Sequence, residues 1–196
     1  MNEINAAPCF PLPKYHSVLV APKFRQKSAP QHGQPAGHGR FAPQRLLLAA
    51  KNRPMRVTLQ RINQAVRFEG SNSAGNTVIL EGSPDIGGEG QGVRPMELLL
   101  LSLASCSSMD VASILKKMRQ PVDDFRVEVD GERATDEVPA VFKKIHLHFQ
   151  FKGDLRPDRV AEAIRISVEK YCSVARMLEK TAEITWAYSI EGSEEA

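Results

Sequence analysis

The chain has 196 residues and a formal net charge of only +3, which allows one domain with a proper hydrophobic core. Three cysteines are too few for a secreted disulfide scaffold, and their spacing matches no zinc motif, so a reducing cytoplasm is the expected location. The longest apolar run, residues 98–106, is interrupted by serine and is too short to span a membrane, so no membrane association is expected.

The positive charge is concentrated in residues 1–54. This segment holds eight Lys and Arg residues, one acid and eight of the thirteen prolines, so it carries +7 and the remainder carries −4. It has no sustained apolar period and is expected to be a disordered, basic, Pro-rich extension. An upstream start codon, with Met55 opening the functional protein, is favoured over an organelle transit peptide. Because the remainder is net acidic and lacks a basic face with interleaved aromatics, nucleic-acid binding is not expected.

Residues 56–81 alternate between polar and apolar side chains in the manner of β-strands, in R-V-T-L-Q-R-I, A-V-R-F-E-G and N-T-V-I-L-E-G. The turn residues S-N-S-A-G-N between the last two predict a hairpin. A glycine-rich loop, S-P-D-I-G-G-E-G-Q-G, follows. It lacks the G-K-[ST] ending of a phosphate loop and is therefore expected to be a flexible connection.

A long helix is predicted from Pro95 to about Arg119. Pro95 suits the first helical position, Glu97 in the first turn interacts favourably with the helix dipole, and Pro121 stops the helix. Residues 98–104 are apolar nearly all round, which predicts burial on several sides. A single small domain has difficulty surrounding a helix so fully, and a second subunit would complete the burial.

Two further strands, F-R-V-E-V-D-G and K-K-I-H-L-H-F-Q-F-K-G, have a period of two. In the second, His146 and His148 project from the same face and could chelate a metal, but no third ligand is nearby in sequence. Alternating polar residues on a half-solvated sheet explain them better, and no metal site is predicted. Helices at about 157–171 and 173–179 and a strand E-I-T-W-A-Y-S-I complete an α+β fold of order β-β-β-α-β-β-α-α-β.

Two cysteines lie in the predicted helical regions. Asp110 follows Cys106 by one helical turn on the same face, and Arg176 follows Cys172 by the same interval. A bare carboxylate raises the pKa of a neighbouring thiol and an arginine lowers it, so an Asp110–Arg176 pair would leave both sulfurs beside a partly neutralised cluster. Glu97, nine residues before Cys106, falls on the opposite side of a straight helix and is expected to serve the helix start. Both thiols can equally be inert core residues.

The run G-V-R-P-M-E-L-L-L-L-S-L-A-S-C-S-S-M-D-V-A-S-I-L-K-K, followed by E-K-Y-C-S-V-A-R-M-L-E, resembles the OsmC-like proteins, relatives of the organic hydroperoxide resistance (Ohr) peroxidases. The resemblance covers residues 55–192 and leaves the extension and an acidic tail, 193–196, outside. It implies an OsmC-like fold in which a long buried helix lies between β-sheets. It also implies an intertwined homodimer with its active sites at the subunit interface.

The resemblance further implies a thiol-dependent peroxidase that acts on organic hydroperoxides or hydrogen peroxide without a cofactor. Cys106 matches the attacking cysteine and Cys172 the resolving one, and a cellular dithiol would reduce their disulfide. The peroxidase branch carries a glutamate ten residues before the first cysteine, paired with an arginine from the N-terminal strands. Here that position is Met96, the acid is Glu97, and Arg67 is the candidate arginine, a pattern typical of a divergent OsmC-like branch. The alternative is a non-catalytic ligand-binding or redox-sensing dimer.

Overall fold

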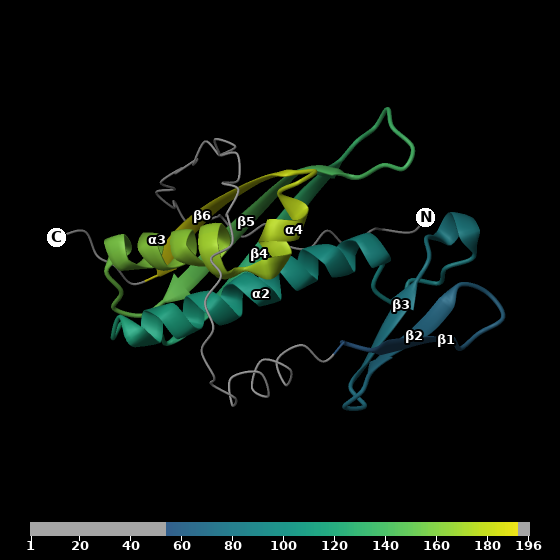
Figure 1. Cartoon of the computed structure of the whole chain (residues 1–196), viewed down its shortest axis with the longest axis horizontal. Helices are drawn as coiled ribbons and strands as arrows, with labels where there is room; N and C mark the ends of the chain where they lie inside the picture. The colour runs from purple at the N-terminus through teal and green to yellow at the C-terminus, as the bar shows by residue number, and fades with distance from the viewer. Residues whose placement is uncertain (1–53, 192–196) are drawn as a thin grey trace, which may run out of the picture. The chain divides into compact units, whose positions relative to one another are not determined.

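The computed structural model describes residues 54–191 (Figure 1). The predicted extension is therefore outside the described residues except for Pro54, and the acidic tail and Cys9 are outside them as well. The described chain divides into two compact units, residues 54–99 and residues 100–191. Each unit contains one three-stranded sheet, and the long helix α2 begins in the first unit and continues into the second.

The first unit is built on an antiparallel sheet of order β1-β2-β3. Its strands are β1 (Val57–Arg61), β2 (Arg67–Asn72) and β3 (Thr77–Glu81). The predicted hairpin between β2 and β3 is confirmed. In its turn Gly75 has a φ of 83°, and Asn72 Oδ1 accepts hydrogen bonds from the backbone N–H groups of Ala74 and Asn76.

The glycine-rich loop after β3 contains a short helix and backbone hydrogen bonds that the expectation of a flexible connection did not include. A short 3-10 helix, η1, occupies Pro84–Ile86. Further along, the Glu81 N–H donates to the Val93 carbonyl oxygen, and the Val93 N–H donates to that of Ile79. The loop thus returns along the open edge of β3, where its backbone polar groups find partners.

Helix α2 spans Pro95–Lys117, slightly shorter than predicted. At its start, Glu97 Oε2 accepts a hydrogen bond from the Arg94 N–H at 2.9 Å, one half of a capping box. At its end, Arg119 has a φ of 57°, and the Gln120 N–H donates to the Leu115 carbonyl oxygen. This is a Schellman-type termination just before Pro121.

Only one row of α2 is buried within the described residues. The row consists of residues at four-residue spacing: Leu103, Ser107, Val111 and Leu115. Leu99, Leu101 and Met109 are exposed, so the predicted burial on several sides is not supplied by the described part of one chain. By length and composition alone α2 could cross a membrane, but the core helix of a water-soluble protein passes the same test.

The second unit combines a mixed sheet with a helical crossover. The sheet has the order β4 (Asp124–Arg133), β5 (Phe142–Lys152), β6 (Glu183–Glu191), with β4 antiparallel and β6 parallel to β5. The crossover between β5 and β6 contains α3 (Pro157–Ile166), a π-helical turn η2 (Ser167–Tyr171) and α4 (Ser173–Leu178). Figure 1 shows α3 and α4 in front of this sheet. The predicted α+β order of elements is confirmed, although the predicted helix 157–171 ends as a π turn.

One face of this sheet forms the core. Along β5 the apolar residues Ile145, Leu147, Phe149 and Phe151 are buried, as their alternation predicts. His146 and His148 lie on the other face, where their ring nitrogens contact the hydroxyls of Thr185 at 2.8 Å and Ser189 at 3.4 Å. No group of three or more metal-ligating side chains is present in residues 54–191.

Candidate functional site

The thiols of Cys106 and Cys172 meet. Cys106 is a half-buried residue of α2, and Cys172 is fully buried between η2 and α4. Both are free thiols, and the Cys106 side chain is one of the groups that act directly on the Cys172 thiol, so the two side chains are neighbours. The structure therefore brings together the two residues that the sequence singled out, from elements far apart along the chain.

A pair of buried serines ties the Cys172 segment to α2. Ser167 Oγ donates to the carbonyl oxygen of Ser107 at 3.1 Å, directly after Cys106 in the helix. The Cys172 N–H donates to the Ser167 carbonyl oxygen at 2.8 Å, closing the wider ring of a π turn. Because Ser167 and Ser107 are both fully buried, this link fixes the position of Cys172 relative to Cys106.

The environment of Cys172 keeps it protonated. Burial, with a smaller contribution from the adjacent Cys106, raises the pKa of its thiol to about 12. The Ala175 N–H donates to Cys172 Sγ at 3.4 Å and lowers the pKa, but it offsets only part of the effect of burial. Cys172 is consequently a neutral thiol at physiological pH.

Alkylation is expected to distinguish the two thiols. At about pH 8 a pKa of about 12, in place of 9.0, lowers the thiolate fraction of Cys172 about a thousandfold, and its side chain is also inaccessible. Iodoacetamide should therefore label Cys106 much faster than Cys172 in the folded, reduced chain, as measured by peptide mass mapping after short exposure. In denaturant the two should react at similar rates. Equal labelling in the folded chain would contradict this assignment.

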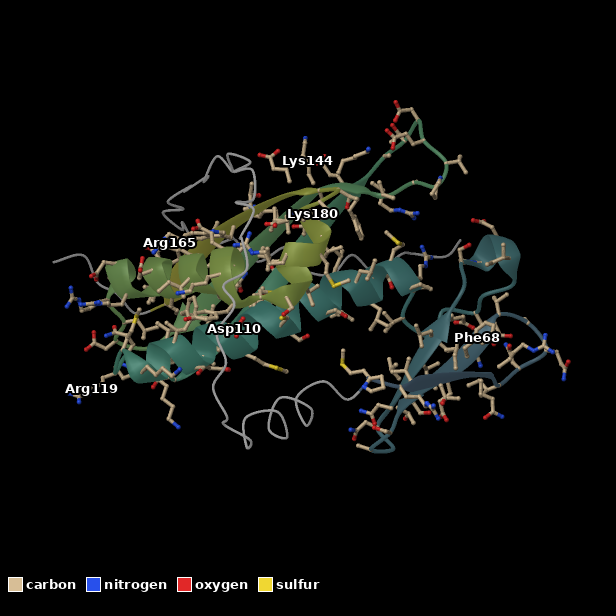
Figure 2. All side chains as sticks on the ribbon, viewed as in Figure 1. Phe68, Asp110, Arg119, Lys144, Arg165 and Lys180 are labelled. Carbon is tan, nitrogen blue, oxygen red and sulfur yellow. The ribbon has the colours of Figure 1, made fainter. Side chains whose placement is uncertain are left out.

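Asp110 and Arg176 do not pair with each other. Asp110 lies in the C-terminal half of α2, and its Oδ2 is buried without a hydrogen-bond partner among the described residues (Figure 2). Arg176 is engaged elsewhere, since Nη1 donates to both carboxylate oxygens of Glu179 at 3.1 Å and Nη2 donates to the Glu169 carbonyl oxygen. The neutralised cluster that the spacing allowed is therefore not formed, and the Asp110 carboxyl has a free oxygen one helical turn from Cys106.

Arg67, at the start of β2, binds two carboxylates of the first unit. Its Nε donates to Glu81 Oε1 at 3.0 Å and its Nη2 donates to Glu89 Oε2 at 2.5 Å. Burial raises the pKa of Glu81, but backbone N–H groups of Gln91 and Glu89 and the Arg67 guanidinium outweigh it and leave that pKa below its usual range. The partners of Arg67 within this unit are thus Glu81 and Glu89, whereas Glu97 caps α2.

Sequence reasoning missed both partners of Arg67. Glu81 could have been predicted, because the hairpin of β2 and β3 places it opposite Arg67 once the register of the two strands is known. Glu89 lies in the glycine-rich loop, and no periodicity connects a loop residue with a strand. The serine link between Ser167 and Ser107 was also missed, since it depends on the π turn.

The chain is similar to proteins of one family. A sequence model described as OsmC-like protein matches residues 88–187. Protein YhfA of Escherichia coli K12 is 41% identical over 128 residues, which cover 65% of this chain and 92% of YhfA. The crystal structure of a hypothetical protein from Aquifex aeolicus is 30% identical, with a TM-score of 0.60 over 71% of this chain and 98% of that one. An organic hydroperoxide resistance protein OsmC from Legionella pneumophila shares the fold, with 14% identity and a TM-score of 0.56 over 70% of this chain and 98% of that one.

Proposed function

Because the chain belongs to the OsmC-like protein family, we propose that it is a cytoplasmic, thiol-dependent peroxidase that reduces organic hydroperoxides or hydrogen peroxide. The observation that supports this most directly is that Cys106 and Cys172, which are far apart in the sequence, have neighbouring thiols. Inert core cysteines need not meet, whereas formation of a disulfide requires two sulfurs within reach of each other.

The burial of the two thiols supports a division of roles. Cys106 is partly accessible and attacks the O–O bond, so that its sulfur takes one oxygen and becomes a sulfenic acid while the other oxygen leaves as an alcohol after gaining a proton. Cys172 then attacks the Cys106 sulfur, a disulfide forms and the hydroxyl group leaves with the Cys172 proton as water. A dithiol restores both thiols by exchange. Because Cys172 is buried and stays protonated until this second step, it is the resolving residue.

The proposal includes a homodimer. The exposed side of α2 carries Leu99, Leu101 and Met109, and the edge strand β1 exposes Val57 and Leu59. Large apolar side chains gathered on a helix that is apolar nearly all round favour association with another protein surface. A second copy of the chain, as the family resemblance implies, would cover the exposed side of α2.

A redox-sensing dimer is the second candidate, and one observation favours it. In the peroxidase branch the arginine pairs with a glutamate at the start of the long helix. Here Arg67 binds Glu81 and Glu89 instead, and neither lies at the start of α2. A sensor would keep the same thiol pair and form the same disulfide, but it would not turn over peroxide with a dithiol.

A thiol count tests the proposal. The reduced full chain is mixed with a stoichiometric amount of tert-butyl hydroperoxide, and the free thiols are titrated. They should fall from three to one per chain, and the protein should consume excess peroxide when a dithiol is supplied. Disulfide formation without turnover would favour the sensor. Thiols that stay unchanged at millimolar peroxide would exclude both redox functions.

A further inference from the structure

Asp110 has a carboxylate oxygen that the fold buries and leaves without a partner. Oδ2 is enclosed, and no hydrogen bond to it forms within residues 54–191. Burying a charged oxygen in this way is costly, and such groups are normally satisfied. Asp110 is four residues after Cys106 on the same helix, an interval that places their Cβ atoms about 5–6 Å apart. The unsatisfied oxygen therefore belongs to the surroundings of the half-buried thiol.

Several polar groups that lie near the two cysteines in the sequence are already engaged. Ser107 Oγ donates to the Leu103 carbonyl oxygen at 2.5 Å. Glu169 is paired with Arg165 and Glu179 with Arg176. The two histidines of β5 lie on the sheet face opposite the buried core. Among the titratable side chains of residues 100–191, only Asp110 has a buried oxygen that lacks a partner.

We propose that Asp110 is a further catalytic residue, which takes the proton of the Cys106 thiol and returns it to the departing alkoxide. This inference rests on the proposed peroxidase function and adds a residue to it. An interval of one helical turn places the carboxyl group beside the thiol, where a proton can pass between them.

The proton balance of the first step closes without any outside group. The Cys106 S–H gives its proton to the Asp110 carboxylate, which leaves a thiolate beside a neutral carboxylic acid. The thiolate attacks the distal peroxide oxygen, the O–O bond breaks with its electron pair on the alkoxide oxygen, and the sulfur is oxidised to a sulfenic acid. Asp110 then protonates the alkoxide, an alcohol leaves, and the carboxylate is restored.

This proton transfer avoids the charge repulsion that a carboxylate would exert on a neighbouring thiolate. A permanent negative charge near Cys106 would disfavour the thiolate. Once the carboxylate has accepted the proton, however, it is neutral while the thiolate exists, so the two negative charges never stand together. Cys172 is not needed in this step, and its proton remains available for the water released in the second step.

The test isolates the first step. In a Cys172→Ser background the sulfenic acid accumulates, and its formation from tert-butyl hydroperoxide is followed by a sulfenic-acid probe. Adding Asp110→Asn should slow this step about 100-fold. Asp136→Asn, which removes the same charge from an exposed loop, is the matched control and should leave the rate unchanged. In Asp110→Ala, added formate should restore part of the rate, because a small acid can occupy the vacated position; a purely structural role would not show this response.

Each outcome decides a different point. If the Cys172→Ser chain reacts and Asp110→Asn reacts equally fast, or if formate has no effect on a folded Asp110→Ala chain, the role of Asp110 is overturned while the peroxidase function stands. If the Cys172→Ser chain itself does not react although iodoacetamide readily labels Cys106, the peroxidase function fails, and this inference falls with it. If Asp110→Asn does not give a native circular dichroism spectrum, Asp110→Ser takes its place under the same criteria.

Discussion

A chain carrying Cys106→Ser is expected to lose no thiol to a stoichiometric hydroperoxide and to consume no excess peroxide. The two remaining thiols should still titrate in denaturant after the exposure. Cys172 cannot replace the missing nucleophile, because its side chain is 0% exposed and its pKa is about 12. Activity should therefore fall to the level of the uncatalysed reaction, a larger effect than removal of any supporting group.

Two further cysteine variants show whether the loss of peroxide reduction is specific to Cys106. Cys9→Ser makes the same chemical change outside the described residues and should leave the loss of two thiols intact. Cys172→Ser should lose one thiol, at Cys106, and retain a sulfenic acid that excess peroxide oxidises further. If Cys106→Ser still loses thiols at the wild-type rate, the attacking residue has been assigned wrongly.

A Leu101→Asp substitution is expected to convert the proposed homodimer into monomers. Leu101 is 53% exposed on the side of α2 that the described chain leaves uncovered. If a second copy packs there, the aspartate would bury an unpaired charge, which costs several kcal/mol and weakens association by orders of magnitude. Sedimentation equilibrium should show the wild-type chain at twice its mass of 21.7 kDa and the variant at that mass.

Val138→Asp is the matched control for the dimer. Val138 is fully exposed in the loop between β4 and β5, so the same change of side chain there should leave the oligomeric state unaltered. Circular dichroism should show that the monomeric Leu101→Asp chain keeps its secondary structure. A wild-type chain that sediments as a monomer, or a Leu101→Asp chain that stays dimeric, would contradict the assignment of this surface.

The parts of the fold set by side-chain periodicity could be predicted from the sequence. The alternation along β5 correctly identifies its buried face, and Pro95, Glu97 and Pro121 bracket α2 to within a few residues. These features are local, since each depends on residues within one element. The meeting of Cys106 and Cys172 is different, because only the family motifs suggested it and spacing alone left both thiols as possible core residues.

The predictions about the partners of Arg67, Asp110 and Arg176 failed because those partners are set by tertiary contacts. Arg67 binds Glu89 because the glycine-rich loop folds back along β3, and nothing in the loop composition encodes that return. Arg176 has several carboxylates within a few residues, and only the helix geometry shows that it selects Glu179 and so leaves Asp110 alone. Neither the Arg67–Glu89 pair nor the Arg176–Glu179 pair can be predicted from helical spacing. Spacing shows which side chains can come close, but not which of them form a contact.

The π turn makes the site sensitive to the length of the chain as well as to its chemistry. Between Ser167 and Tyr171 the helix accommodates one residue more than an α-helical turn would, and Cys172 follows immediately. Deleting a single codon from this stretch would preserve the neighbouring cysteine, serine and arginine, yet it would rotate Cys172 by about 100° around the helix axis. The approach of Cys106 and Cys172 therefore depends on the number of residues in this stretch. A deletion that keeps the reading frame and every functional side chain would disrupt it, and a comparison of conserved residues would not reveal the change.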